Sequence, residues 1–275
     1  MSLRQLRRRA VSRVWGRARL PDWAALEAEG LDPVGEIWFE DERGDAAALL
    51  VKYLFTSEWL SIQVHPDDEG ARAAGHRRGK DEAWLVVEAD PGAEIGIGLT
   101  REVGRDELRA AAMDGSIERL LDRRPVRGGD VFYSPAGTIH AIGPGLVLLE
   151  IQQNVDLTYR LYDYGRPREL HLEEAVAAAT AAPLRASGEG GEIERGRELI
   201  AGGGAFAVER WLGPWEGRIE ASSAVLIPMQ GSCTLGDGDG APGTVWALDG
   251  SASVRIAEGA ELLVAYERQV PVTRS

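Results

Sequence analysis

The chain has 275 residues, of which 44% are apolar and 27% are charged, and this composition is typical of a globular protein rather than a disordered one. No stretch approaches the roughly 20 apolar residues that a membrane span requires, and the formal charge of −13 argues against a nucleic-acid partner, because phosphate backbones bind clustered Lys and Arg. The single cysteine, Cys233, excludes an intrachain disulfide and a cysteine-based zinc site, and it is compatible with a cytoplasmic location.

The first 19 residues are strongly basic, because they contain seven arginines and no acidic residue. They lack the apolar run of a secretory signal. An amphipathic membrane or targeting segment is one interpretation of such an arm. We favour the other, a solvated helix that folds back on the acidic body of the protein.

Short runs rich in β-branched and aromatic residues follow, with Gly, Pro and Asp between them. This spacing predicts an antiparallel sandwich or barrel. The expected strands are 35–40, 48–55, 60–64, 83–87, 94–99, 130–133 and 146–152. Helical periodicity interrupts them at 67–76, 102–123 and 172–182, and Thr100 is a suitable N-cap for the second of these helices.

The composition changes near residue 182, where Gly, Glu and Arg become frequent. A second β-rich region follows, with expected strands at 206–211, 223–228, 244–248 and 261–266, and it contains no histidine. We therefore predict a catalytic domain at 1–190 with a helical insert near 101–124, a linker at 191–204, and a non-catalytic β-rich domain at 205–275.

Four side chains in three separated segments form a candidate metal site. Gln63 and His65 are two residues apart in an expected strand, so both can project from the same face. Glu82 begins the next expected strand, and His140 ends the pattern G-x5-P-x-G-x2-H, which resembles the second signature motif of the cupin superfamily. Two imidazoles, a carboxylate and an amide oxygen suit zinc, or manganese, iron or cobalt.

Simpler interpretations exist for several of these residues. His65 and His140 could be hydrogen-bonded core residues, although their occurrence in two separate motifs favours a metal site. Asp67 and Asp68 could be ligands, but we expect them to cap the following helix. His76 and His171 are expected to be surface or packing residues.

Longer motifs resemble type I phosphomannose isomerase, a family within the cupin superfamily. The resemblance covers residues 14 to 184 and weakens beyond 204. The motifs are QVHPDD (63–68), GKDEAW (79–84), PAGTIHA (135–141) and EIQQNVDLTYRLYDYGR (150–166). The resemblance implies a cupin-type antiparallel β-sandwich or jelly-roll barrel with helical insertions, followed by a second, degenerate cupin-like β domain.

The resemblance also implies zinc-dependent interconversion of mannose 6-phosphate and fructose 6-phosphate, with Gln63, His65, Glu82 and His140 as ligands. It implies that Arg160 is the catalytic arginine and that Lys80 and Ser61 lie near the substrate or its phosphate. Lys80 precedes Glu82 by two residues, so on an extended segment it would face the same cavity. Glu150 is a candidate general base, although it could instead hydrogen-bond Arg160.

The chain departs from the family at Ala83, where Met or Cys is usual, and its helical insert is short. These departures leave three alternatives open. The chain could be a sugar-phosphate-binding metal cupin without turnover, an isomerase of a related hexose phosphate, or a metal cupin oxygenase. The oxygenase would leave Arg160 and Lys80 unexplained.

Overall fold

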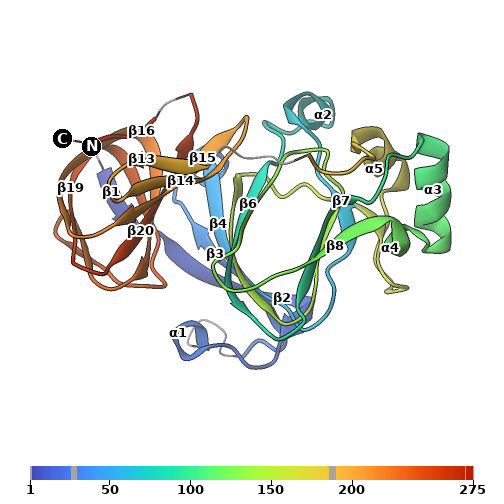
Figure 1. Ribbon diagram of the computed structural model, residues 1–275, viewed down its shortest axis with the longest axis horizontal. Helices are drawn as coiled ribbons and strands as arrows, with labels where there is room; N and C mark the ends of the chain where they lie inside the picture. Colours follow the sequence, from blue (N-terminus) through green and yellow to red (C-terminus); the bar gives the residue numbers. More distant parts are fainter. Residues whose placement is uncertain (1, 26–29, 186–189, 270, 275) are drawn as a thin grey trace.

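The computed structural model describes residues 2–25, 30–185, 190–269 and 271–274, and within them the chain is mainly β. Two lobes lie side by side (Figure 1). In the first lobe a six-stranded and a five-stranded antiparallel sheet face each other, and the second lobe is a ten-stranded sheet that curls around a core of its own. The predicted mainly β fold is confirmed.

The six-stranded sheet has the order β2 (Arg7–Arg17), β3 (Val34–Glu40), β4 (Leu49–Phe55), β11 (Leu146–Gln153), β6 (Glu82–Ala89) and β9 (Val131–Ser134). The five-stranded sheet has the order β12 (Tyr159–Tyr162), β5 (Ile62–Val64), β10 (His140–Ile142), β7 (Glu94–Leu99) and β8 (Leu121–Pro125). The ten-stranded sheet runs β13 (Gly191–Glu194), β14 (Arg197–Gly202), β15 (Phe206–Leu212), β20 (Glu261–Glu267), β16 (Trp215–Gln230), β19 (Trp246–Ile256), β17 (Cys233–Leu235) and β18 (Gly238–Gly240), with β1 (Ser2–Gln5) on β19 and β21 (Thr273–Arg274) on β16.

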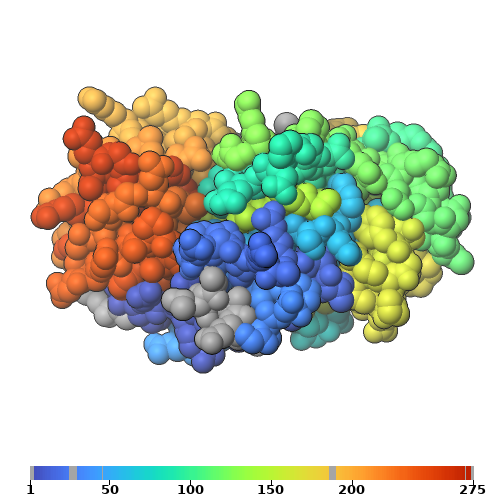
Figure 2. Space-filling view, turned by 90° about the horizontal axis from the view of Figure 1, so that it is seen from below, coloured from blue at the N-terminus to red at the C-terminus, as the bar shows by residue number. Residues whose placement is uncertain are grey.

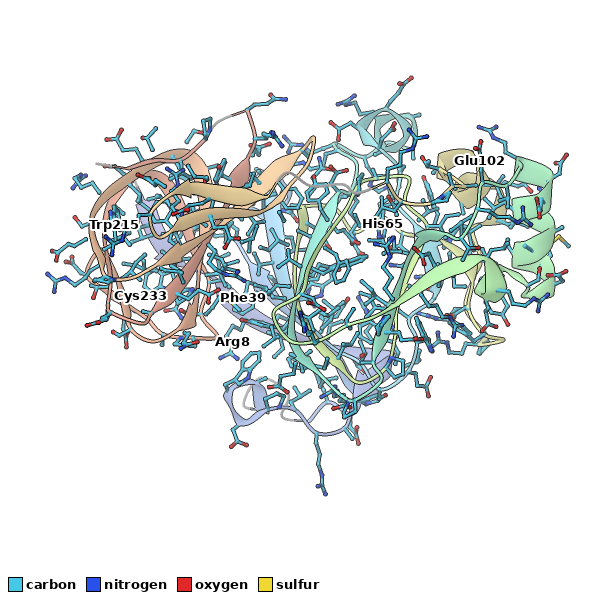
Figure 3. All side chains as sticks on the ribbon, viewed as in Figure 1. Arg8, Phe39, His65, Glu102, Trp215 and Cys233 are labelled. Carbon is cyan, nitrogen blue, oxygen red and sulfur yellow. The ribbon has the colours of Figure 1, made fainter. Side chains whose placement is uncertain are left out.

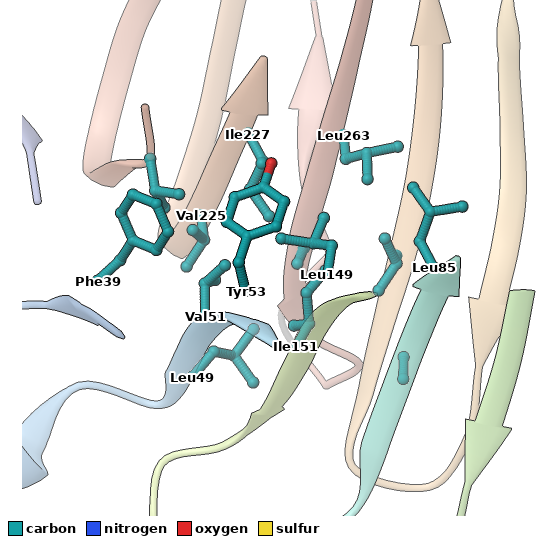
Figure 4. Close-up of a cluster of buried hydrophobic side chains, with 14 of the residues drawn as sticks. Phe39, Leu49, Val51, Tyr53, Leu85, Leu149, Ile151, Val225, Ile227 and Leu263 are labelled. Carbon is teal, nitrogen blue, oxygen red and sulfur yellow. The ribbon is translucent and has the colours of Figure 1, made fainter. Parts of the chain in front are cut away.

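The six-stranded sheet is buried on both faces. Val51 and Tyr53 of β4 point into a core shared with the second lobe, whereas Lys52 and Leu54 point toward the five-stranded sheet. Figure 4 shows the shared core, in which Phe39, Tyr53, Leu149 and Ile151 meet Val225, Ile227 and Leu263. A strand covered on both sides needs few exposed polar residues, which explains the nearly continuous apolar sequence of β4.

The helices lie mostly against the outer face of the five-stranded sheet (Figure 1). They are α3 (Arg105–Asp114), α4 (Ile117–Leu120) and α5 (Leu172–Ala178); α1 (Asp22–Ala25), α2 (Asp68–Ala73) and a short 3₁₀ turn at Gly44–Ala46 lie elsewhere. Among the described residues, none of these helices has the length and apolar character of a membrane span.

The predicted continuous helix at 102–123 is wrong in its bounds. Gly104, not Thr100, is the N-cap of α3. Gly115 adopts a left-handed conformation with φ of 79°, and this conformation ends the helix, as glycine often does. After the short α4 the chain turns extended and pairs with β7 as β8, so the insert is two helices and an edge strand.

The predicted N-terminal helix is also wrong, because the basic arm forms β1 and β2. β1 pairs with β19 of the second lobe and β2 with β3 of the first, so the arm bridges the two sheets. Figure 2 shows these residues in blue on the surface beside the second lobe. The expected contact with acidic groups does occur, since Arg4 pairs with Asp41 and Asp249. Backbone pairing with two sheets explains why the arm is extended.

The predicted linker at 191–204 is occupied for most of its length by β13 and β14. β14 pairs with β15, and the exposed β13 forms the edge of the sheet. The Gly, Glu and Arg composition of this segment reflects a solvent-facing edge rather than a loose connection. Because β1 also joins this sheet, residues from both ends of the chain build the second lobe.

Candidate metal centre

The candidate ligands converge between the two sheets of the first lobe. Gln63 and His65 lie on or at the end of β5, and His140 begins β10, where it pairs with Gln63. Glu82 begins β6 on the facing sheet. His65 accordingly lies in the interior of the lobe (Figure 3). Antiparallel pairing has therefore brought together residues that are up to 77 positions apart.

The buried side chains of His65, Glu82 and His140 each offer one ligand atom, and these atoms all lie within 4.8 Å of one another. His65 Nε2 is 3.3 Å from Glu82 Oε1, and His140 Nε2 is 3.5 Å from Glu82 Oε2. Both carboxylate oxygens are buried, and neither accepts a hydrogen bond of good geometry within the described residues. A buried carboxylate is costly unless cations complement it; the Lys80 ammonium lies 2.6 Å from Oε1, and a metal ion would complement the rest of the group.

Both imidazoles are oriented by backbone carbonyls. His65 Nδ1 is 2.8 Å from Leu157 O, and His140 Nδ1 is 2.9 Å from Thr138 O. A carbonyl can only accept, so Nδ1 carries the proton in each ring and Nε2 presents its lone pair toward Glu82. A hydrogen bond from the Nδ1 proton to a backbone carbonyl commonly orients a metal-binding histidine.

The protonation states of His65, His140 and Glu82 also suit a metal site. Burial lowers the pKa of His140 to about 4, and burial together with the neighbouring Lys80 also lowers the pKa of His65. Burial alone would raise the pKa of Glu82, but Lys80 and His65 outweigh it and hold that pKa well below its usual value. Two neutral imidazoles and an ionised carboxylate are a donor set suited to a divalent transition metal.

Gln63 lies beside these three residues, and its amide nitrogen rather than its oxygen faces His140. Its Nε2 is 3.3 Å from His140 Nε2, while its Oε1 accepts a hydrogen bond of 3.0 Å from Ser61 Oγ. An oxygen ligand requires the amide to rotate by half a turn, and this exchanges two atoms of nearly equal size. Gln63 is therefore within reach of the site, and Ser61 controls its orientation.

Lys80 reaches the same cluster, as its two-residue spacing from Glu82 predicts. Its Nζ lies 2.6 Å from Glu82 Oε1 and 3.4 Å from His65 Nε2. Burial alone would lower the pKa of Lys80, but Glu82 and Glu150 outweigh burial and raise it. A buried ammonium ion thus stands beside the candidate ligands.

Glu150 is buried on β11, next to the cluster. Its Oε2 accepts a hydrogen bond of 3.2 Å from Trp84 Nε1, and its Oε1 is 3.4 Å from Lys52 Nζ. Burial, followed by repulsion from Glu82, raises the pKa of Glu150. The alternative that Glu150 binds Arg160 is not supported, because Trp84 and Lys52 are its observed partners. Sequence reasoning overlooked Lys52, although a lysine within the apolar strand LLVKYLF was a signal for it.

A cavity of about 370 Å³ opens onto this cluster. Its lining includes Ser61, Gln63, Lys80, Glu150 and Arg160, so the proposed active-site residues face one space. Arg160 lies on β12 opposite Gln63, and its backbone is hydrogen-bonded on both sides by His171. His171 thus has a positioning role that the sequence did not indicate.

Of the two aspartates after His65, Asp67 caps α2, whereas the predicted capping role of Asp68 is wrong because Asp68 lies inside the helix. Asp67 Oδ1 accepts a hydrogen bond of 2.8 Å from Gly70 N at the start of α2, as predicted. Asp68 Oδ1 accepts one from Gly79 N, which fixes the loop that leads to Lys80. His76 is exposed on that loop. None of the three joins the group of ligand atoms described above.

No family model matches the chain. The chain is 43% identical over 148 residues to mannose-6-phosphate isomerase of Streptococcus mutans, covering 52% of this chain and 46% of that protein. It is 41% identical over 156 residues to mannose-6-phosphate isomerase of Bacillus subtilis, covering 52% of this chain and 49% of that one. The matched stretch therefore spans about half the length of these relatives.

The structure extends this similarity to nearly the whole chain. The crystal structure of the Bacillus subtilis mannose 6-phosphate isomerase matches with a TM-score of 0.81 and 27% identity, covering 97% of this chain and all of that one. A zinc-bound mannose 6-phosphate isomerase matches with a TM-score of 0.73 at 16% identity, which supports the fold alone. The resemblance to phosphomannose isomerases and the cupin-type fold are confirmed.

Proposed function

We propose that this chain is a metal-dependent aldose–ketose isomerase that interconverts mannose 6-phosphate and fructose 6-phosphate through an enediol(ate) intermediate. The observation that carries the proposal is the convergence of His65, Glu82 and His140 at a cavity lined by Lys80 and Arg160. The identity to mannose-6-phosphate isomerases supports it. A cytoplasmic location belongs to the same proposal.

We assign His65, Glu82, His140 and Gln63 to one bound metal, with zinc as the expected ion. Neutral imidazole nitrogens beside carboxylate and amide oxygens are borderline ligands that zinc accepts readily, and manganese, iron and cobalt accept the same set. When bound, such a metal supplies Lewis acidity that polarises a carbonyl oxygen.

Glu150 is the residue we assign to proton transfer between C1 and C2 of the open-chain sugar. A general base works best when its pKa lies near the operating pH, and burial together with Glu82 moves the pKa of Glu150 in that direction. Trp84 and Lys52 fix both carboxylate oxygens, so the group is oriented before substrate arrives.

Lys80, Arg160 and Ser61 are assigned to the substrate oxygens. Enediolate formation places negative charge on oxygen, and preoriented cationic donors in a dry cavity stabilise that charge. Lys80 is held by Glu82 and is protonated, whereas Arg160 is permanently charged and offers a planar fork of donors. Ser61, two residues before Gln63, already donates a hydrogen bond from its Oγ to the Gln63 amide oxygen.

The test is a coupled assay of fructose 6-phosphate formation from mannose 6-phosphate, with metal-stripped protein to which zinc is returned. We expect zinc to restore turnover, His140→Ala to lose both metal and turnover, and Arg160→Gln to keep its metal but lose turnover. His76→Ala is the matched control, because His76 is exposed and outside the site. Its metal content and rate should equal those of the unmodified protein.

Two outcomes would replace the proposal. Metal-loaded protein that binds mannose 6-phosphate without forming product would indicate a sugar-phosphate-binding cupin. Turnover of a different hexose phosphate at a higher kcat/KM would keep the isomerase chemistry and change the substrate.

A further inference from the structure

Three arginines from separate segments meet at one side of the active-site cavity. Arg13 comes from the N-terminal strand β2, Arg160 from β12, and Arg168 from the loop after β12, and all three line the cavity. Burial lowers the pKa of Arg160, and repulsion from Arg168 and Arg13 lowers it further. Arg13 and Arg168 are therefore each close enough to Arg160 to repel it.

Buried carboxylates hold two of these arginines in place. Glu36 Oε2 is 2.8 Å from Arg13 Nη2 and also accepts a hydrogen bond from Trp38 Nε1. Asp163, only 2% exposed, accepts hydrogen bonds of 2.5 and 2.6 Å from Arg168. Because a guanidinium has five N–H donors, each of these contacts leaves donors that can serve a ligand in the cavity.

Arg160 differs from its two neighbours. Within the described part of the chain no carboxylate lies within ion-pairing distance of it, and its Nη1 makes only a long contact of 3.5 Å with Glu169 O. Five basic and three acidic side chains line the cavity, in a protein whose formal charge is −13. A cavity with more basic than acidic side chains, in a protein of net negative charge, is suited to an anionic ligand.

We propose that Arg13 and Arg168 bind the phosphate group of the substrate, beside the Arg160 guanidinium that is assigned to the sugar oxygens, and that Arg13 is a residue that distinguishes a sugar phosphate from a neutral sugar. Glu36 is then a positioning residue, which acts by holding Arg13. The inference rests on the proposed function and gives the basic N-terminal strand a role in it.

The chemistry of Arg13 and Arg168 favours a phosphate monoester over other anions. Such a group carries a charge of about −1.5 to −2 near neutral pH and has three acceptor oxygens. Planar guanidinium forks match those oxygens, and several forks can bind one phosphate from different sides. Lys80 and Gln63 line the same cavity toward the candidate metal ligands, so one substrate could contact both regions.

The experiment compares Arg13→Gln and Arg13→Lys with the unmodified protein, all loaded with zinc. Binding of inorganic phosphate is measured by calorimetry, and KM and kcat are measured for mannose 6-phosphate. Arg7→Gln is the matched control, because Arg7 lies on the same strand with its side chain 79% exposed. A variant with both Arg13→Gln and Glu36→Gln leaves no unpaired buried carboxylate, and it replaces Arg13→Gln if the single variant fails to fold.

We expect Arg13→Gln to weaken phosphate binding and to raise KM by about tenfold or more, because a hydrogen bond to a charged group is lost. The value of kcat should change by less than about twofold, since Arg13 acts on binding in ground and transition states alike. Arg13→Lys should recover part of the affinity, and Arg7→Gln should change neither constant.

The outcomes separate this inference from the proposed function. Phosphate affinity and KM that stay unchanged in folded Arg13→Gln, in a protein that isomerises mannose 6-phosphate, would overturn the role of Arg13 and leave the function intact. Phosphate binding that depends on Arg13, in a protein without isomerase turnover, would support the anion site and overturn the function.

Discussion

Replacing Glu209 should destabilise the whole protein, although Glu209 lies in the second lobe, away from the proposed active site. Glu209 is completely buried and accepts hydrogen bonds from Arg197, Trp211 Nε1 and Tyr266 OH. Arg197 is itself only 13% exposed, so water cannot replace its carboxylate partner. The change Glu209→Gln keeps the size and one acceptor oxygen but removes the charge.

The expected cost follows from leaving the largely buried Arg197 with only the more exposed Glu194, 3.4 Å away, as a counter-charge. Breaking a buried ion pair on one side costs about 3 to 5 kcal/mol. The lower end, about 3 kcal/mol, is expected because the glutamine oxygen can still accept one of the hydrogen bonds. For a protein of this size that corresponds to a fall in Tm of about 6 to 12 °C.

The control is Glu216→Gln on β16 of the same lobe. Glu216 pairs with Arg255, and both side chains are more than 60% exposed, so the loss should be no more than about 1 kcal/mol. Urea unfolding followed by circular dichroism measures both variants, and the isomerase assay below the transition should give the same kcat for each. Equal stability of Glu209→Gln and Glu216→Gln would refute the reasoning.

Two further predictions concern pH and catalysis. Burial opposes ionisation of Asp41, but hydrogen bonds from Arg43 and Arg4 outweigh burial and lower the pKa of Asp41 to about 2. The ionised carboxylate therefore stabilises the fold above pH 4, and this contribution is lost as the pH falls toward 2. At neutral pH the free energy of unfolding of the unmodified protein should exceed that of Asp41→Asn by about 1 to 2 kcal/mol, a value that allows for the partial exposure of the arginines. A difference that does not shrink in acid would contradict this prediction. The change Glu150→Gln should lower kcat by about 10² to 10⁴ while metal content and KM stay close to normal, and loss of bound metal would instead indicate a structural role.

Local sequence patterns predicted most strands of the first lobe, because runs of apolar and β-branched residues between turn-forming Gly, Pro and Asp mark them. The expected strand at 94–99 coincides with β7, and those at 48–55 and 146–152 differ from β4 and β11 by one residue at one end. Helix bounds were harder to predict. The apolar periodicity of 102–123 continues across Gly115, whose left-handed conformation could not be read from periodicity alone.

The N-terminal arm shows a different limit of sequence reasoning. Seven arginines correctly indicated contact with acidic groups, but they did not reveal the backbone partners, which are β3 and β19. Isolated propensity is a weak guide when two sheet edges far apart in sequence are available for pairing. The same limit applies to β13 and β14, whose polar composition resembles a linker.

The parts of the candidate site that could be predicted are those whose residues lie close together in the sequence. Gln63 and His65 share a strand face, and Lys80 precedes Glu82 on an extended segment, so these relations follow from the sequence. Arg13 and Arg168 could not be identified in this way, because they reach the cavity through strand pairing and a loop, and the apolar strand around Lys52 marked it as unusual without revealing its partner. The register that places Lys52 opposite Glu150 is set by the whole of β4 and β11.

The six-stranded sheet links the two lobes to the chemistry. One of its faces carries Lys52 and Glu150 toward the cavity and Glu82 toward the candidate metal ligands, and the other carries Val51, Tyr53 and Leu149 into the core shared with the second lobe. Because adjacent residues of a strand point to opposite faces, a shift of one residue in register would exchange the two sets. The apolar contact with the second lobe therefore helps to hold the polar residues at the positions that the proposed reaction requires. This gives a lobe without histidine a physical role in the function of the other.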